Sequence, residues 1–170
     1  LPPEVVVSEM RNHQRYFAVV DGAGKLRNRF VAVAGTPVRD PKVARHGSEP
    51  VLRARLADAR FFFEEDRKRK LRDRIEPLGR RTYQAKLGSE LDRTHRIGAV
   101  ASALARAAGK PELVPDVLEA ARLAKTDLTT GMVGEFPELQ GIMGAHYARG
   151  EGMKPEIADA IEDHYRPLGA

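Results

Sequence analysis

The sequence has no cysteine among its 170 residues, and this absence removes several kinds of chemistry at once. Disulfide bonds, thiolate nucleophiles and cysteine-ligated zinc are all excluded. The sequence also has no apolar run long enough to cross a bilayer. Its first residues, LPPEVVVSEM, lack the basic start and the small-residue cleavage site of a secretion signal. These features predict a folded cytoplasmic protein with no membrane contact.

Recognisable catalytic motifs are also scarce. The segment GAGK, residues 22 to 25, resembles part of a phosphate-binding loop, but the full glycine spacing and the Lys-Ser/Thr ending are missing. None of the serines lies in a nucleophile elbow, and no combination of Ser, His and Asp can be argued from spacing. The sequence therefore predicts a plain turn at GAGK. Because the chain lacks an initiator Met, we expect it to be a piece of a longer protein.

Positive charge is concentrated in the first half of the chain. Residues 1 to 82 carry 19 Lys plus Arg against 11 Asp plus Glu, whereas residues 83 to 170 carry 10 against 13, which matches the totals of 29 and 24. A concentrated positive field usually faces a polyanion, and nucleic acid is the commonest polyanion in the cytoplasm. A basic, well-solvated surface without a partner explains the composition equally well.

The pattern of the first 82 residues predicts a short helix over residues 3 to 15 and a hairpin of strands over 16 to 20 and 29 to 35. The Asp-Gly pair and second Gly between the strands supply the positive φ angles of a turn. A Pro- and Gly-rich connection follows, and Pro50 suits the first turn of a long helix.

The long helix VLRARLADARFFFEEDRKRK has apolar residues on two faces, which predicts an element sandwiched between two layers. Between those faces Arg53, Arg60 and Arg67 recur every seven residues and form one basic stripe. Such a stripe either faces a polyanion or is a solvated edge with local partners such as Glu64.

From residue 83 onward the apolar spacing is helical throughout. Gly109 suits the left-handed turn that ends a first helix, and Pro115 starts a second with Leu118, Ala121 and Leu128 in its apolar stripe. We therefore predict a mainly α fold with a small N-terminal β-containing part. The predicted domains are residues 1–82, with the hairpin and the basic connecting helix, and residues 83–170, which are all α.

Two related segments, PELQGIMGAHY at 137–147 and PEIADAIEDHY at 155–165, supply the last two predicted helices. The prolines fit helix starts, while His146 and His164 would lie in the last turns. A shared metal would need a third ligand at a helical spacing, and no such spacing occurs among the five histidines. Gly141 and Gly144 weaken the first helix, which indicates close approach by another backbone.

Several long blocks make the chain similar to a known family. MRNHQRYFAV, NRFVAVAG, VLRARLADARFFFEEDRK, the segment from AKLG to DRTHRI, and MVGEFPELQGIMGAHYA resemble the beta subunit of bacterial heterotetrameric glycyl-tRNA synthetase. The resemblance implies a central slice of a longer subunit. It also implies that the first part is the end of a domain like the B3/B4 module of phenylalanyl-tRNA synthetase, and that the second part is a helical domain of the HD phosphohydrolase type.

The resemblance further implies a role in glycine–tRNA ligase, an aminoacyl-tRNA synthetase built from two alpha and two beta subunits. The alpha subunit would use ATP and Mg, this segment would hold no cofactor, and glycine tRNA and the alpha subunit would be its partners. Phosphate-directed cations would hold the tRNA. The candidate tRNA-binding residues are Arg11, His13, Arg15, Arg53, Arg60, Arg67, Lys68, Arg69, Lys70, Arg72 and Arg74.

HD proteins bind metal through a His, an adjacent His-Asp pair and a distant Asp. His95 matches the first of these, but the pair falls where this chain has Lys125, Thr126 and Asp127. A lysine in place of a ligand opposes divalent metal binding, so we predict an inactive scaffold without metal or catalytic residues. The alternatives are an active HD-type metal-dependent phosphohydrolase and a purely architectural module that contacts other subunits.

Overall fold

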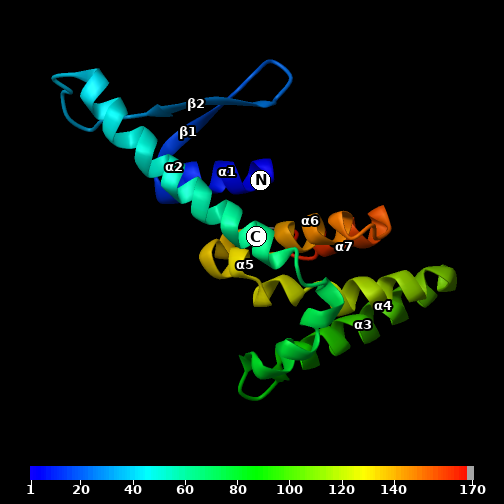
Figure 1. The fold of residues 1–170 in the computed structure, drawn as a ribbon. Helices are drawn as coiled ribbons and strands as arrows, with labels where there is room; N and C mark the ends of the chain where they lie inside the picture. The colour runs from blue at the N-terminus through cyan, green and yellow to red at the C-terminus, as the bar shows by residue number, and fades with distance from the viewer. Residues whose placement is uncertain (168–170) are drawn as a thin grey trace. The chain divides into compact units, whose positions relative to one another are not determined.

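The computed structural model describes residues 1–167, apart from the side chain of Ala44. The chain forms two compact units, Leu1–Glu64 and Glu65–Ala170. The fold is mainly α with a small two-stranded sheet near the N-terminus, as predicted (Figure 1). Among the described residues, no helix combines the length and the apolar character that a bilayer crossing requires.

The first unit begins with helix α1 (Pro3–Ser8), a π-helical turn η1 (Glu9–His13), and the antiparallel strands β1 (Tyr16–Val20) and β2 (Leu26–Ala32). The predicted hairpin is confirmed, but its second strand starts three residues earlier than expected. The turn is tight because the side chain of Asp21 accepts hydrogen bonds from the backbone of Ala23 and Lys25, and Gly24 takes a positive φ of 79°.

Helix α2 (Pro41–Asp66) begins nine residues before the predicted start at Pro50, which instead lies inside the helix. Pro41 occupies the start, where its missing N–H costs nothing, and the Asp40 side chain accepts from the Lys42 backbone at 2.8 Å. The expectation of two buried faces is also wrong. Leu52 and Ala59 are buried, whereas Phe61 on the other face remains 58% exposed.

Short 3₁₀ turns η2 (Leu71–Arg74) and η3 (Glu76–Arg80) open the second unit, followed by strands β3 (Thr82–Gln84) and β4 (Gly88–Ser89). This small hairpin corrects the expectation that everything after residue 82 is helical. Gly88 adopts a φ of 84° that other residues avoid, which lets the chain reverse within four residues. The predicted domain boundary after residue 82 stays a prediction, while η2 and η3 belong to the second compact unit.

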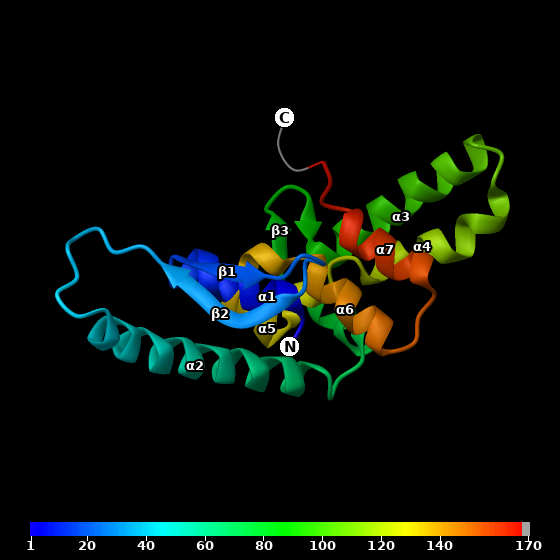
Figure 2. The ribbon, with the colours of Figure 1, turned by 90° about the horizontal axis from the view of Figure 1, so that it is seen from above.

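Helices α3 (Glu90–Ala107) and α4 (Val114–Leu123) form an antiparallel pair, joined through Gly109 and the 3₁₀ turn η4 (Pro111–Leu113) (Figure 2). Gly109 has a φ of 72°, in agreement with its predicted helix-ending role. The second helix is shorter than predicted, because α4 ends at Leu123. Leu128 therefore belongs to the separate turn η5 (Thr126–Thr129).

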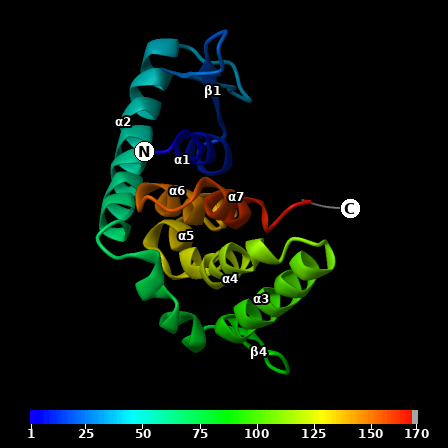
Figure 3. The same ribbon diagram turned by 90° about the vertical axis from the view of Figure 1, so that its right-hand side faces the viewer.

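The remaining elements are α5 (Gly131–Glu135), the 3₁₀ turn η6 (Pro137–Leu139), α6 (Ile142–Gly150) and α7 (Pro155–Asp163). Figure 3 shows α6 and α7 side by side. Pro155 starts α7 as predicted, but Pro137 starts η6, so His146 lies in the middle of α6 and not in its last turn. His164 follows the last residue of α7 as its C-cap.

Candidate functional site

The second unit has a buried polar centre around Lys125, which directly precedes turn η5, and Asp127, the second residue of that turn. Their side chains are 1% and 0% exposed. Fully buried charges are costly unless other groups compensate them. The partners of these two side chains therefore decide what the centre can do.

Asp127 caps helix α6 from another part of the chain. Its Oδ2 atom accepts hydrogen bonds from the backbone N–H groups of Gly141 at 2.6 Å and Gly144 at 3.2 Å. These groups have no partner within their own helix. Burial raises the pKa of Asp127 to about 6, and the two backbone hydrogen bonds and the charge of Lys125 oppose that shift. The carboxylate thus serves the backbone of α6.

Gly141 and Gly144 allow this approach. Gly141 has a φ of 80°, and a Cβ there would lie 3.2 Å from the backbone oxygens of Ile161 and Glu162. A Cβ on Gly144 would lie 2.9 Å from the Ile161 side chain and 3.2 Å from Asp127 Oδ2. The predicted close backbone approach is therefore correct for Gly141, whereas side chains crowd Gly144.

Lys125 packs against an aromatic ring. Its Nζ lies 3.6 Å from the centroid of the Tyr165 ring, and the Tyr165 hydroxyl donates to Gln140 Oε1 at 2.8 Å. Burial lowers the pKa of Lys125 to about 8, and the charge of Arg93 adds to this effect, while Glu90 and Asp127 oppose it. An ammonium group over a ring face is stabilised by the ring quadrupole, so the Tyr165 ring partly offsets the cost of burying Lys125.

The three positions that resemble an HD site do not share one environment. His95 is exposed on α3, whereas Lys125 and Asp127 are buried. The α3 residues whose charges act on Lys125 are Glu90 and Arg93. Within residues 1–167, no group of three or more His, Asp or Glu side chains is arranged to hold a metal ion.

A second buried polar cluster, which the sequence did not indicate, is centred on Asp66 at the end of α2. Its carboxylate accepts from the backbone of Gly131 and Met132 at 2.9 Å each and from the Tyr147 hydroxyl at 3.0 Å. Arg74 forms an ion pair with this carboxylate, since its Nη2 lies 3.3 Å from Asp66 Oδ1. Arg74 is 6% exposed and also donates to the Thr129 carbonyl oxygen. This burial argues against a phosphate contact by Arg74.

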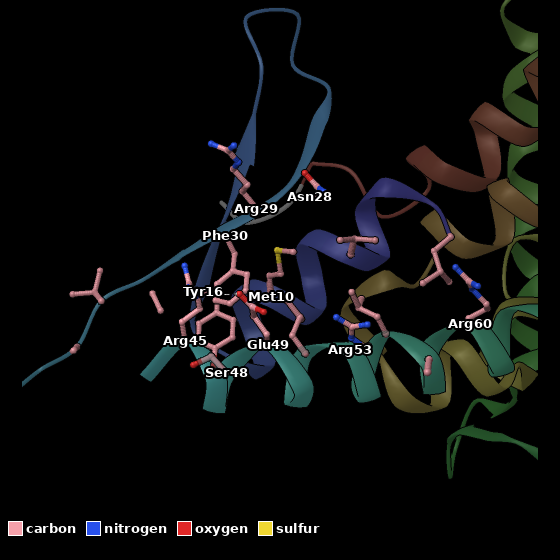
Figure 4. Close-up of a pocket in the computed structure, with 18 of the residues that line it drawn as sticks. Met10, Tyr16, Asn28, Arg29, Phe30, Arg45, Ser48, Glu49, Arg53 and Arg60 are labelled. Carbon is pink, nitrogen blue, oxygen red and sulfur yellow. Dashed lines mark ion pairs between the residues drawn. The ribbon is translucent and has the colours of Figure 1, made fainter. Parts of the chain in front are cut away.

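In the first unit, Arg53 and Arg60 extend from α2 along an open groove of about 1690 Å³ (Figure 4). Both side chains are exposed. They are seven residues apart on one helix, so they lie on one stripe separated by about 10 Å along its axis. Neither guanidinium makes a hydrogen bond or an ion pair within the described part of the chain.

The groove combines these arginines and the carboxylates of Glu49 and Glu64 with an apolar floor. Met10 from η1, Phe30 from β2 and Leu52 from α2 line it together with Tyr16, whose ring stacks on Phe30 at 4.7 Å between centroids. Arg29 and Arg45 also line the groove, and the sequence analysis missed both. Arg45 is paired with Glu49 at 3.7 Å. Arg45 precedes Arg53 by eight residues, and this helical spacing would have been visible if the predicted helix had been extended toward Pro41.

Several of the other predicted cations have partners within the second unit. Arg67 is exposed and has a partner of its own. Lys68 pairs with Glu65, the Arg69 guanidinium donates to the Asp73 carbonyl oxygen, and Arg72 pairs with Glu119 at 2.6 Å. The remaining members of the predicted set are all exposed, and they are Arg11, His13, Arg15 and Lys70.

Exposed guanidinium groups along a helix, in a mainly helical fold, are typical of proteins that bind a polyanion such as RNA. The family model described as "Glycyl-tRNA synthetase beta subunit" matches residues 1–170. The chain therefore belongs to the glycyl-tRNA synthetase beta subunit family.

Curated relatives agree with this assignment. A protein from Anaeromyxobacter sp. (strain K) named "Glycine--tRNA ligase beta subunit" is 82% identical over 170 residues, which cover all of this chain and 24% of the relative. Proteins of the same name from Myxococcus xanthus and Phenylobacterium zucineum are 56% and 54% identical, and the matches cover 24% and 26% of those relatives. The chain thus spans about a quarter of the length of these relatives.

Proposed function

We propose that this chain is part of a glycine–tRNA ligase and helps that enzyme to hold its tRNA. The family match over residues 1–170 carries the proposal. In this proposal the enzyme works in the cytoplasm as two alpha and two beta subunits, and the alpha subunit carries out the ATP- and Mg-dependent chemistry. The chain itself contributes binding and no catalytic residue.

The proposed RNA contact is the groove side of α2. Arg53 and Arg60 are exposed and have no ion-pair partner among residues 1–167, so they can bind phosphate oxygens without first breaking such a pair. Guanidinium groups bind phosphates through two parallel hydrogen bonds. Contacts of this kind position an RNA without reading its sequence.

The buried centre of the second unit has a supporting role in this proposal. Asp127 is committed to the N-terminus of α6, and Lys125 to the ring of Tyr165. A lysine ammonium beside the carboxylate repels a divalent cation. We therefore propose that the part resembling an HD domain acts as a scaffold, and the first part, like the B3/B4 module, carries the tRNA-facing helix.

A kinetic experiment tests the α2 assignment. In the reconstituted ligase, the double variant Arg53→Glu and Arg60→Glu should raise the KM for tRNA and leave the KM for glycine and ATP unchanged. It should also make log K for tRNA less dependent on log salt, by about 0.7 to 0.9 per lost phosphate contact.

The matched control is the double variant Arg106→Glu and Arg122→Glu, which reverses two exposed cations of α3 and α4. This control should bind tRNA like the unmodified enzyme. If the α2 variant has unchanged tRNA kinetics, the contact assigned to Arg53 and Arg60 is wrong.

An architectural role is a second candidate, because the floor of the groove is apolar and Phe61 and Val33 beside it are 58% and 75% exposed. Polypeptide of a longer subunit would cover such a surface. In that case the α2 variant would weaken subunit assembly, measured by analytical ultracentrifugation, and leave the salt dependence of tRNA binding intact.

A further inference from the structure

The β3–β4 hairpin leads directly into α3 (Figures 2 and 3). Exposed cations gather on this hairpin and on the first turns of α3, a region that we call the hairpin corner. The exposed side chains of the corner are Arg81, Lys86, His95, Arg96 and the aromatic Tyr83, and Arg93 beside them is half-buried. The charge balance of the second half is negative overall, so this local concentration is hidden in the totals.

The corner is built on a rigid frame. Ser89 caps α3, since its Oγ accepts from the Asp92 backbone at 3.2 Å, and Asp92 Oδ2 accepts from the Ser89 backbone at 2.8 Å. The backbone N–H of Glu90 donates to the Arg81 carbonyl oxygen at 2.8 Å, which closes the hairpin onto the helix. At the tip, the Lys86 backbone donates to Gln84 Oε1 at 2.6 Å. These bonds hold Arg81, Lys86 and Arg96 on a fixed scaffold.

The acidic groups of the corner are already engaged. The Asp92 carboxylate accepts from both the backbone and the hydroxyl of Ser89, and these hydrogen bonds lower its pKa, with help from the charges of Arg96 and His95. Glu90 is 8% exposed, and its Oε2 lies 3.4 Å from Arg93 Nη1. By contrast, the side chains of Arg81, Lys86 and Arg96 are exposed and make no hydrogen bond or ion pair with any described residue.

An aromatic ring accompanies these cations. The guanidinium carbon of Arg93 lies 4.2 Å from the centroid of the Tyr83 ring, and the Tyr83 residue is 40% exposed. A ring held by a guanidinium and open to solvent offers a stacking surface for a base, and Arg planes add to such stacks. Leu87 beside it is 51% exposed. Cations with an exposed ring are the features by which proteins bind unpaired nucleotides.

We propose that the hairpin corner is a second tRNA contact, which binds the phosphates of an unpaired segment through Arg81, Lys86 and Arg96 and stacks a base on Tyr83. The inference rests on the proposed function, because it takes tRNA as the polyanion. In this proposal the RNA contacts both compact units, whereas the charge balance of the sequence alone favours a contact with the first half only. A protein partner would use the apolar Leu87 and would not depend on the three charges.

The test measures binding of a fluorescently labelled glycine tRNA to the reconstituted ligase across a series of salt concentrations. The triple variant Arg81→Glu, Lys86→Glu and Arg96→Glu should weaken binding about tenfold or more and make the slope of log K against log salt shallower by about 2. The control reverses Arg106 and Lys110 to Glu, two exposed cations in the last turn of α3 and just beyond it. The control should retain the slope of the unmodified enzyme.

Substitutions of Tyr83 test the stacking contact separately from charge. Tyr83→Leu should weaken binding about fivefold or more at every salt concentration, whereas Tyr83→Phe, which keeps the ring, should bind like the unmodified enzyme. The variants should have unchanged circular dichroism, because Tyr83 is outside the core.

The outcomes separate this inference from the proposed function. A shallower slope in the corner variant with no effect of the α2 variant would support the corner and refute the α2 contact. An unchanged slope in the corner variant, or an equal loss in the control, would overturn the inference. Loss of subunit assembly with the salt dependence intact would also overturn it, in favour of a protein contact.

Discussion

Lys125 and Asp127 show, at the scale of residues, how buried charges are held in the interior of the second unit. Both groups are buried, yet each has a structural partner: the N-terminus of α6 for Asp127 and the Tyr165 ring for Lys125. The sequence alone predicted that Lys125 opposes metal binding. It could not predict that Asp127 caps α6, because that contact joins residues 14 and 17 positions apart through the tertiary fold.

The raised pKa of Asp127 predicts a pH dependence of stability. Its folded pKa, about 6, is above the ordinary value of 3.8, so the folded state disfavours the carboxylate. The stabilising contribution of the protonated form is complete below the ordinary value and is lost as the pH rises through about 6, a change of up to about 3 kcal/mol. Asp127→Asn keeps an acceptor for the two N–H groups and removes the titration.

Thermal unfolding followed by circular dichroism between about pH 4 and pH 7 measures this effect. The difference in Tm between Asp127→Asn and the unmodified chain should grow in favour of the variant as the pH rises. A difference that is constant across this range would show that the folded-state pKa of Asp127 is not raised above its unfolded value.

At the scale of elements, sequence patterns located helices well but placed their ends poorly. The hairpin, α7 and the turn at Gly109 were predicted because Asp-Gly, Pro and Gly have strong local preferences. The start of α2 was missed because Pro41 and Pro50 are both compatible with a first turn. The break between α4 and η5 was missed because Leu128 fits a continued helical stripe, whereas burial of Lys125 and Asp127 requires the chain to turn.

The packing of α6 on α7 predicts that a side chain at Gly144 lowers the stability of the chain. Gly144→Ala should destabilise the chain by about 1–3 kcal/mol, because its Cβ would lie 2.9 Å from Ile161 Cγ2. This cost exceeds the gain of about 1 kcal/mol that Ala offers in a helix.

The control is Gly134→Ala in α5, where no atom lies within 4 Å of the added Cβ. That variant should be neutral or slightly more stable. Chemical denaturation of both variants measures the two free energies of unfolding, and equal effects would show that the close packing around Gly144 is not limiting.

At the scale of the whole molecule, the distribution of positive charge and the family membership both favour binding of tRNA. The total charge of +5 divides unevenly along the sequence, and the sequence predicted the stripe at Arg53 and Arg60. It did not distinguish these exposed groups from Arg74, which is buried against Asp66, or from Arg72, which is paired with Glu119. Only a fold determines which cations have internal partners, so the sequence could not separate Arg72 and Arg74 from the cations whose side chains are free of such partners in the described residues.

The central claim is that α2 lies against tRNA in the working enzyme, and site-directed photo-crosslinking tests it most directly. Because this chain has no cysteine, a single Cys within it can carry a photoreactive group. Cysteines elsewhere in the enzyme would first be replaced by Ser. Ala57→Cys places the probe on the exposed groove side of α2 between Arg53 and Arg60, and Ala160→Cys places it on the exposed side of α7. The account predicts a salt-sensitive crosslink to glycine tRNA from position 57 and little from position 160. Equal yields from the two positions, or none from position 57, would contradict it.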